Sequence, residues 1–210
     1  MTKIGIWGGT GYAGAHIASE AVKRGFEVTA VARKTPEEPI DGVTYVEGAI
    51  DDVTFVDKLA ADNDVVVVAI APSKQVPSAL PALVATARAH GTRLGFMGGA
   101  GSSLVSPDGP RLIDTPDFHE AWKAEAQALV DVLAALRADT SSLDWFVVSP
   151  PALFGRFAPG ETTGKYRIGG DVLVVKDDGM SEISGTDFAL AFVDEIAEPT
   201  HRRERFTVGH

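Results

Sequence analysis

The sequence predicts an α/β fold of the Rossmann type, a doubly wound parallel sheet with a small C-terminal substrate-side elaboration. Apolar runs that suit buried strands alternate with segments that have helical spacing. Four consecutive valines at residues 65–68 suit a central strand that is buried on both faces. A glycine-rich stretch joins the first strand to the first helix. Because alternating strands and helices build a parallel sheet covered on both faces, we expect this architecture.

The expected elements follow one another along a single domain that spans residues 1–210. Apolar runs predict strands at residues 3–7, 27–32, 43–46, 64–71, 93–97 and 144–149. Helical spacing predicts helices at residues 13–23, 52–60, 77–89 and 119–136. Gly91 follows His90 at the end of the third helix, where a glycine can end a helix and a cation complements its dipole.

The pattern changes near residue 149. Residues 149–183 are rich in proline, glycine and charge, with a short β-like piece at residues 172–176, and we interpret them as a substrate-side loop region. A last helix is predicted at residues 186–196, capped by Thr186 or Asp187. A closing strand is predicted at residues 205–208, and neither a repeat nor a linker divides the chain.

Composition excludes several classes of function. The chain has 210 residues, 45% of them hydrophobic, and a net charge of −10, which disfavours nucleic acid as a partner because such binding depends on Lys and Arg. It has no cysteine, so disulfides and thiolate nucleophiles are excluded, and its five histidines lack metal-ligand spacing. The most apolar run, residues 65–71, is too short to span a bilayer. We therefore expect a cytoplasmic protein with no membrane partner.

Gly8, Gly11 and Gly14 form a G-x-x-G-x-x-G motif between the first strand and the first helix. In this context the first glycine permits a tight turn, the second lets the backbone approach a pyrophosphate, and the third lets helix and strand pack closely. The helix N-terminus then offers unpaired N–H groups to the phosphates. A glycine-rich turn without a ligand is the alternative. We predict a dinucleotide site that also includes Thr10 and Tyr12.

The end of the second predicted strand favours NADP(H) over NAD(H). Sites for NAD usually carry Asp or Glu there to bind the ribose 2′-hydroxyl, whereas an arginine accommodates a 2′-phosphate. Here the strand ends in Arg33 and Lys34, with no carboxylate before Glu37. Ordinary solvated charges are the alternative for both cations. Asp51 is predicted beside the adenine, and Asp52 suits either that place or a helix N-cap.

Residues just after the fourth, fifth and sixth strands are expected to face the nicotinamide. Ligands of open α/β sheets cross the carboxyl ends of the strands at the topological switch point. The predicted cofactor residues in these segments are Ala71, Pro72, Gly98, Gly99 and Pro150. Hydride transfer needs mainly close and dry positioning of donor and acceptor, because the reactive chemistry belongs to the cofactor.

The order of these motifs resembles the atypical short-chain dehydrogenase/reductase group. Within that group it resembles the NADH-flavin reductase branch, which is related to NmrA-like and biliverdin reductase B-like NAD(P)H-binding proteins. The resemblance covers nearly the whole chain and rests on four segments. They are GIWGGTGYAG at residues 5–14, MGGAGSS at 97–103, SPPALFGRFAPGETTGKYRIGGD at 149–171 and ISGTDFALAFVDEIAEPTHRRERFTVG at 183–209. The last two segments are the specific ones.

Classical members of this superfamily carry a Tyr-x-x-x-Lys pair and a substrate-binding serine, and this chain departs from that pattern. Ser102 occupies the serine position and Lys123 the lysine position, so the resemblance implies catalytic roles for both and a cofactor contact for Lys123. His119 stands four residues before Lys123, and no tyrosine occurs between Tyr45 and Tyr166. His119 is a candidate proton donor because histidine side chains in general have a pKa near neutral, but we favour a solvated helix cap.

Without a firm proton donor, a flavin is the more suitable hydride acceptor. Its ring takes hydride at one nitrogen and can draw a proton from water, so the site needs mainly an aromatic-lined slot. The candidate substrate residues are Phe154, Tyr166 and Arg167, with Met97, Trp122 and Phe157 as further walls. Tyr166 and Arg167 lie in a polar, glycine-rich loop with little core to join. A core role is the alternative for Met97 and Trp122.

Three functions remain open. The first, which we favour, is an NADPH-dependent oxidoreductase that reduces FMN, FAD or another flavin-like or quinone-like small aromatic acceptor. The second is a non-catalytic NADP(H) sensor of the NmrA-like type that acts on a protein. The third is a sugar-nucleotide epimerase or dehydratase, which is weaker because those enzymes generally rely on the missing tyrosine. All three functions are compatible with a homodimer.

Overall fold

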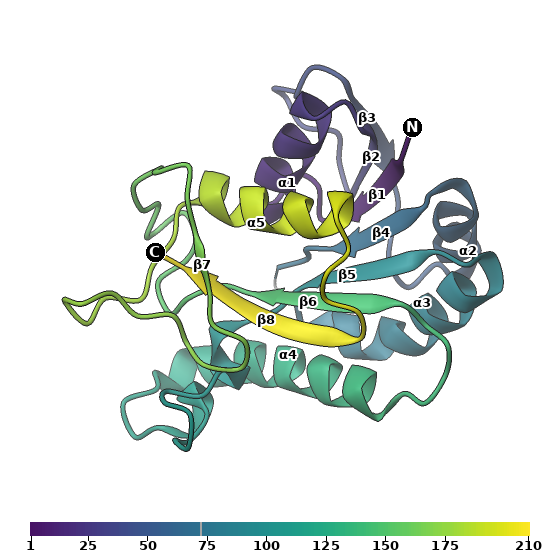
Figure 1. Ribbon diagram of the computed structural model, residues 1–210. Helices are drawn as coiled ribbons and strands as arrows, with labels where there is room; N and C mark the ends of the chain where they lie inside the picture. Colours follow the sequence, from purple (N-terminus) through teal and green to yellow (C-terminus); the bar gives the residue numbers. More distant parts are fainter. Residues whose placement is uncertain (72) are drawn as a thin grey trace.

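The computed structural model describes residues 1–71 and 73–210 and confirms the predicted α/β class. The described residues form five α-helices and a mostly parallel sheet of eight strands, with helices on both faces (Figure 1). Over the same residues, every helix is too short or too polar to cross a lipid bilayer.

The sheet has the strand order β3-β2-β1-β4-β5-β6-β8-β7. Neighbouring strands are parallel except β7 and β8, in which Arg167 pairs with Gly209 and Ile168 with Val208. The strand bounds are β1 Lys3–Trp7, β2 Glu27–Ala32, β3 Val43–Glu47, β4 Val65–Val68, β5 Arg93–Met97, β6 Trp145–Ser149, β7 Arg167–Ile168 and β8 Glu204–Gly209.

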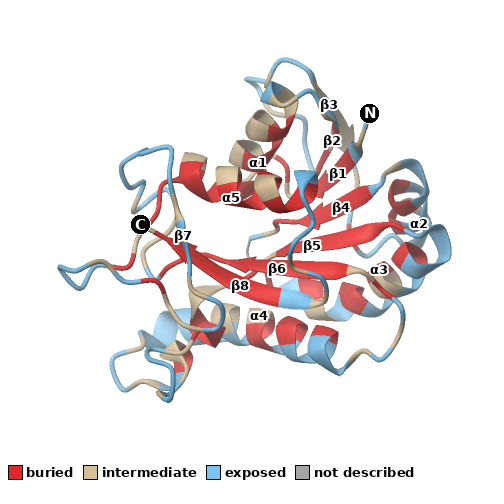
Figure 2. Cartoon of the chain, viewed as in Figure 1, coloured by how far each residue is buried: buried red, intermediate tan, exposed pale blue. Residues whose placement is uncertain are grey.

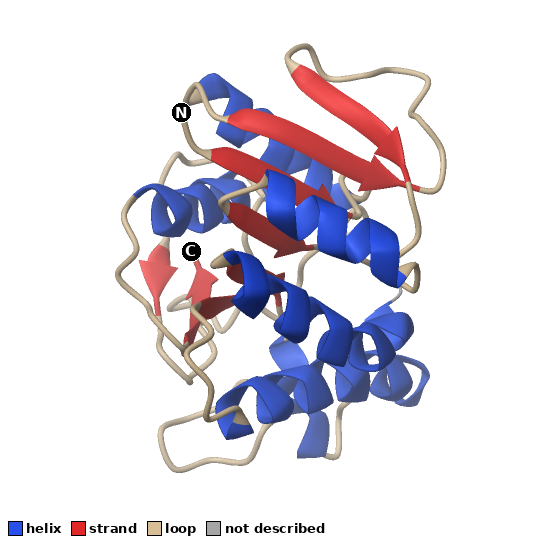
Figure 3. Ribbon diagram, turned by 90° about the vertical axis from the view of Figure 1, so that its right-hand side faces the viewer, coloured by secondary structure: helices blue, strands red, loops and turns tan. Residues whose placement is uncertain are grey.

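The helices form two layers, and the sheet lies between them (Figure 3). Helices α1 and α5 pack on each other over one face, whereas α2, α3 and α4 cover the other face. The helix bounds are α1 Tyr12–Lys23, α2 Val53–Asp62, α3 Val76–His90, α4 Glu120–Ala138 and α5 Gly185–Ala197.

Strand β4 supplies side chains to the hydrophobic core on each face of the sheet. Val65 and Val67 belong to the cluster beneath α1 and α5, and Val66 and Val68 belong to the cluster on the other face. Because side chains alternate along a strand, four valines in a row fill both cores. Figure 2 shows β4 and its neighbours β1 and β5 as mostly buried.

The prediction of a short strand at residues 172–176 is wrong. Val172 makes only an isolated bridge with Leu104, and the chain pairs with the sheet earlier, in β7. Strand β7 forms there because the outer edge of β8 offers it unpaired backbone groups. The strand predicted at residues 64–71 is shorter than expected, since β4 ends at Val68.

The last helix, α5, has a different cap from the one predicted. Ser184 is the N-cap, and its Oγ accepts a hydrogen bond from the N–H of Asp187 at 3.0 Å. The prediction of Thr186 or Asp187 as the cap is wrong, because both lie inside the first turn. The hydroxyl of Ser184 stands at the spacing that an N-cap requires.

The strand order reverses between β1 and β4. Strands β2 and β3 continue the sheet on one side of β1, and β4, β5 and β6 continue it on the other. Ligands of open α/β sheets bind at such a switch point, beyond the carboxyl ends of the strands. The segments that follow β1, β4, β5 and β6 therefore frame the candidate site.

Candidate functional site

The glycine loop between β1 and α1 is folded tightly against the end of β4. Gly8 has φ of +77°, and a Cβ there would lie 2.5 Å from the carbonyl oxygen of Ala69. A Cβ on Gly14 would lie 2.2 Å from the carbonyl oxygen of Gly8. Gly9, which the sequence motif did not single out, approaches Ala30 so closely that its Cβ would lie 2.5 Å from the Ala30 Cβ. The fold itself therefore requires these three glycines.

Gly11 differs from these glycines. It is the N-cap of α1 at φ of −72°, and the nearest atom to a Cβ there is the carbonyl oxygen of Gly8 at 3.1 Å. No described side chain caps α1, whereas Asp52 caps α2 by accepting from the N–H groups of Thr54 and Phe55. The N-terminus of α1 is therefore open to an anion, which its N–H groups and dipole favour.

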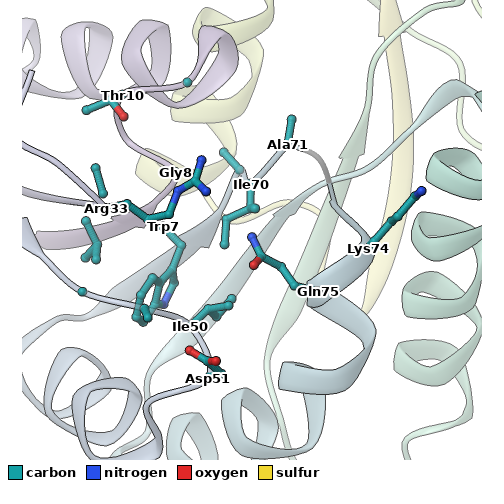
Figure 4. A pocket seen from close by; sticks show the side chains of 16 residues that line it. Trp7, Gly8, Thr10, Arg33, Ile50, Asp51, Ile70, Ala71, Lys74 and Gln75 are labelled. Carbon is teal, nitrogen blue, oxygen red and sulfur yellow. The ribbon is translucent and has the colours of Figure 1, made fainter.

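A cavity of about 390 Å³ opens beside this N-terminus, between the glycine loop and the ends of β2, β3 and β4 (Figure 4). Its polar side chains include Arg33 and Asp51 on one side and Lys74 and Gln75 on the other. The sequence reasoning missed Lys74 and Gln75, whose only signal is that they follow the segment after β4. The predicted cofactor residues that line this cavity are Gly8, Thr10, Gly11, Arg33, Asp51 and Ala71.

Other predicted cofactor residues lie outside the first cavity. Lys34 is exposed and does not line it, and Gly98 is buried against β6. The hydroxyl of Tyr12 accepts a hydrogen bond from the N–H of Gly185 at 3.1 Å, so this side chain joins α1 to α5. Pro72 lies outside the described residues.

A second cavity, of about 350 Å³, lies beyond the ends of β5 and β6 and against α4. Its lining is mostly apolar and aromatic, with Phe118, Trp122 and Phe154 among its members, as is usual for small-molecule sites. Met97, another candidate wall, packs instead against the core beneath α1 and α5. The predicted site residues that line this cavity are Gly99, His119, Pro150 and Phe154.

Ser73 and Glu125 join the walls of the two cavities. The hydroxyl of Ser73 donates a hydrogen bond to Glu125 Oε1 at 2.8 Å, and its backbone N–H donates to the same oxygen. Ala71 and Lys74, on either side of Ser73, line the first cavity, and Glu125 lines the second. Glu125 Oε2 is buried and has no hydrogen-bond partner in the described part of the chain. This contact therefore links a segment that borders the first cavity to a side chain that lines the second.

The three predicted catalytic residues are each engaged by near neighbours in the chain. The hydroxyl of Ser102 donates to a backbone carbonyl oxygen three residues earlier at 3.3 Å. His119 is the N-cap of α4, and its Nδ1 accepts from the N–H of Ala121 at 3.2 Å. Lys123 Nζ pairs with the exposed carboxylate of Glu120 at 2.7 Å. Of the three, His119 alone lines the second cavity, so the structure does not bring them together.

Tyr166 and Arg167 lie apart from both cavities. The hydroxyl of Tyr166 donates to Asp194 Oδ2 at 2.6 Å, and its ring packs against the core beneath α1 and α5. Burial, and then this hydrogen bond, raise the pKa of Tyr166. Arg167 donates to the carbonyl oxygens of Val175 and His210. The expectation of little core to join is wrong for Tyr166, because α5 supplies partners that lie far along the chain. Arg167 is exposed, as that expectation implies.

The parallel sheet, the glycine loop and the open N-terminus of α1 together define a dinucleotide-binding protein of the Rossmann class. The family model described as NAD(P)H-binding matches residues 8–199. This chain therefore belongs to the NAD(P)H-binding family. The match begins at the first glycine of the loop and extends beyond α5, so it includes every lining residue of the two cavities except Trp7.

Three similar proteins extend this comparison over the whole chain. YwnB of Bacillus subtilis (strain 168) is 37% identical over 210 residues, which cover 98% of this chain and 97% of YwnB. A structure from Streptococcus pneumoniae TIGR4, named "a putative NADH-flavin reductase", is 30% identical with a TM-score of 0.88 and full coverage of both chains. A "putative epimerase" from Bacteroides thetaiotaomicron is 30% identical with a TM-score of 0.87, covering 100% of this chain and 97% of that chain. The predicted relationship to NADH-flavin reductase-like, atypical short-chain dehydrogenase/reductase proteins is confirmed.

Proposed function

We propose that the protein is an NADPH-dependent reductase that transfers hydride to a flavin or another planar aromatic acceptor. The observation that carries this proposal is the pair of adjoining cavities at the carboxyl ends of the strands. The first has the open helix N-terminus that suits a dinucleotide pyrophosphate, and the second has an aromatic and apolar lining. The name of the Streptococcus pneumoniae relative supports a flavin as the acceptor.

The cations of the first cavity support NADP(H) as the favoured cofactor. Arg33 directly follows β2, where an arginine accommodates the 2′-phosphate of NADP. Strand β2 ends without the carboxylate that usually binds the ribose 2′-hydroxyl of NAD. Lys74 adds a second cation on the opposite wall (Figure 4). We therefore expect NADPH to bind more tightly than NADH.

In the proposed reaction the dinucleotide supplies the hydride, and the chain positions the reactants. The N-terminus of α1 binds the pyrophosphate, and Arg33 binds the 2′-phosphate. The apolar walls of the second cavity exclude water from the face on which hydride is transferred. Because Ser102 and Lys123 line neither cavity, the proton that completes the reduction comes from water at the mouth of the second cavity.

A non-catalytic NADP(H) sensor is the second candidate. It is favoured by the same position of Ser102 and Lys123 outside both cavities, since a sensor needs no proton donor. An epimerase or dehydratase, in line with the name of the Bacteroides thetaiotaomicron relative, is less suitable. Helix α4 carries His119 as its cap and no tyrosine, so the general acid and base of that chemistry is missing from its usual place.

Turnover by the purified protein separates these candidates. Oxidation of NADPH and of NADH would be followed with FMN, FAD, riboflavin, a quinone and a simple aldehyde, each corrected for the reaction without protein. We expect saturable turnover with a flavin and a preference for NADPH. Protein that binds NADPH but reduces none of these acceptors would contradict the reductase and favour the sensor.

A further inference from the structure

Two aromatic side chains lie exposed beside the mouth of the second cavity. Trp122 on α4 is 55% exposed, and Phe157, in the segment between β6 and β7, is 70% exposed. Their rings stack with centroids 6.4 Å apart and planes inclined by 26°. The other two tryptophans, Trp7 and Trp145, are almost completely buried. Large aromatic groups that a fold leaves together in water mark a binding surface.

This aromatic pair continues the wall of the cavity. Trp122 itself lines the cavity, and the ring of His119 lies 5.1 Å from the indole. Phe154, three residues before Phe157, lines the same cavity. A planar ring that enters between these groups would cover the exposed aromatic faces, and such stacking stabilises a complex beyond the area that it buries.

The net charge of the lining side chains differs in sign between the two cavities. In the described part of the chain, the charged residues lining the first are Arg33, Lys74 and Asp51, whereas those lining the second are Asp117 and Glu125. Carboxylates beside a low-dielectric cavity repel an anionic ligand. The protein's net charge of −10 also disfavours an anionic ligand. The second cavity is therefore poorly suited to a phosphate group.

We propose that Trp122 and Phe157 form a stacking platform for an uncharged planar acceptor, and that Asp117 and Glu125 disfavour acceptors that carry a phosphate. The inference rests on the proposed reductase function and specifies its substrate class. Among flavins it selects riboflavin over FMN, which has the same ring and an added phosphate. One hydride from NADPH and one proton from water convert riboflavin to its dihydro form and release NADP⁺.

The charge preference is tested by kcat/KM for riboflavin and FMN at low and at physiological salt. At low salt we expect kcat/KM for riboflavin to be at least about fivefold higher than for FMN. This ratio should fall as salt screens the carboxylates. Asp117→Asn should also lower the ratio, whereas Asp108→Asn, an exposed change outside both cavities, should leave it unchanged. Equal or higher values for FMN at low salt would overturn the preference.

The stacking platform is tested by Trp122→Ala and Phe157→Ala, with Trp122→Phe as the variant that keeps an aromatic ring. We expect each alanine variant to raise the KM for riboflavin by about fivefold to tenfold, Trp122→Phe to raise it less, and the Kd for NADPH to stay unchanged. Riboflavin should also quench the fluorescence of exposed Trp122 in the presence of NADP⁺. An unchanged KM in both alanine variants would overturn the platform.

These outcomes separate the platform from the reductase itself. If the wild-type protein reduces a flavin and the alanine variants keep its KM, the platform is overturned and the reductase stands. If the wild-type protein reduces none of the flavins, the quinone or the aldehyde, the reductase fails. Quenching of Trp122 by riboflavin then still supports the platform as a binding site, and no quenching overturns it.

Discussion

Gly11 and the glycines around it lack a side chain for different physical reasons. At Gly8 and Gly14 a side chain would collide with backbone carbonyl oxygens, so their lack of a Cβ serves the fold. Gly11 has an ordinary φ, and a Cβ there would need only a small shift of the Gly8 carbonyl oxygen. We therefore infer that the missing side chain at Gly11 serves a ligand, namely the pyrophosphate that approaches the N-terminus of α1.

Gly11→Val should weaken NADPH binding at least about tenfold, or ~1.4 kcal/mol, because the added side chain would occupy the space of the phosphates. The variant should stay folded. Isothermal titration calorimetry gives the Kd, and thermal denaturation reports the fold. Gly14→Val is the contrasting variant, and it should fail to fold stably because its Cβ would lie 2.2 Å from the Gly8 carbonyl oxygen. An unchanged Kd in Gly11→Val would refute the assignment of the loop.

Arg33→Ala should weaken NADPH binding by about 1.5–3 kcal/mol and leave NADH binding nearly unchanged. The expected loss is that of a hydrogen bond to a charged group, which NADH cannot make because it lacks the 2′-phosphate. Fluorescence titration with both cofactors measures the difference. Lys34→Ala is the matched control, since Lys34 is the next residue but does not line the cavity. Equal losses for both cofactors would contradict the role of Arg33.

Helix α5 fixes the position of part of the loop that leads to β7. Asp187, in the first turn of α5, is fully buried and accepts hydrogen bonds from the N–H groups of Thr163 at 2.7 Å and Gly164 at 2.9 Å. His210 Nε2 lies 2.9 Å from the same carboxylate. Burial raises the pKa of Asp187, but these hydrogen bonds outweigh it and lower the pKa overall.

Asp187→Asn should lower the free energy of unfolding by about 1–3 kcal/mol at pH 7, because an amide cannot accept all of these hydrogen bonds. The stability that the carboxylate contributes is present above its ordinary pKa of 3.8 and is lost as the pH falls through the lower pKa of the folded state. Urea unfolding of wild type and variant at pH 7 and near pH 3 measures this. If the difference in unfolding free energy between wild type and Asp187→Asn is as large near pH 3 as at pH 7, this role of the Asp187 carboxylate is contradicted.

At the scale of the whole molecule, one buried ion pair ties the sheet to the α1/α5 layer. Arg93 at the start of β5 donates to Glu195 Oε1 on α5 at 2.6 Å, and both side chains are buried. Glu195 also accepts from Thr200 and from the N–H of His201, which lead into β8. Burial raises the pKa of Glu195, but these partners outweigh it and lower the pKa overall. The pair lies at the opposite ends of the strands from the two cavities.

Glu195→Ala should lower the free energy of unfolding by about 2–4 kcal/mol, because it removes the carboxylate that accepts a hydrogen bond from buried Arg93. Arg93 keeps a longer contact of 3.3 Å between its Nε and Asp144 Oδ1, which limits the loss. The Kd for NADPH of the folded variant should be unchanged, since the pair is remote from the first cavity. Urea denaturation and calorimetry measure the two quantities. Asp62→Asn, which breaks the exposed pair with Lys58, is the control and should leave the free energy of unfolding nearly unchanged. A similarly small loss in Glu195→Ala would contradict this account.

Most of the fold could be predicted because its signals are local. The bounds of β1, β2 and β5 agree with the apolar runs, and the four valines at residues 65–68 indicated a strand buried on both faces. Strand β7 could not be predicted, because its two residues are exposed and its pairing depends on the edge of β8 about 40 residues later. Its sequence carries no period that local reasoning can detect.

The residues of the candidate site were likewise predicted only in part. Motif and strand order placed Gly11 and Arg33, which do line one cavity. Lys74 was missed because a lone lysine after a strand has no distinctive pattern. Tyr166 was assigned to the acceptor because its loop is polar, yet it donates to Asp194, 28 residues away in sequence. Spacing along the chain cannot reveal such a partner.

The sequence by itself determined the α/β class, the order of the main elements and the glycine loop. These follow from side-chain periodicity and from the conformational freedom of glycine, which act over a few residues. Only the tertiary structure decided which polar groups are already engaged, which aromatic rings stay exposed, and that the two cavities adjoin through Ser73 and Glu125. Those outcomes depend on contacts between distant segments, whose free energies are set only when the layers pack together.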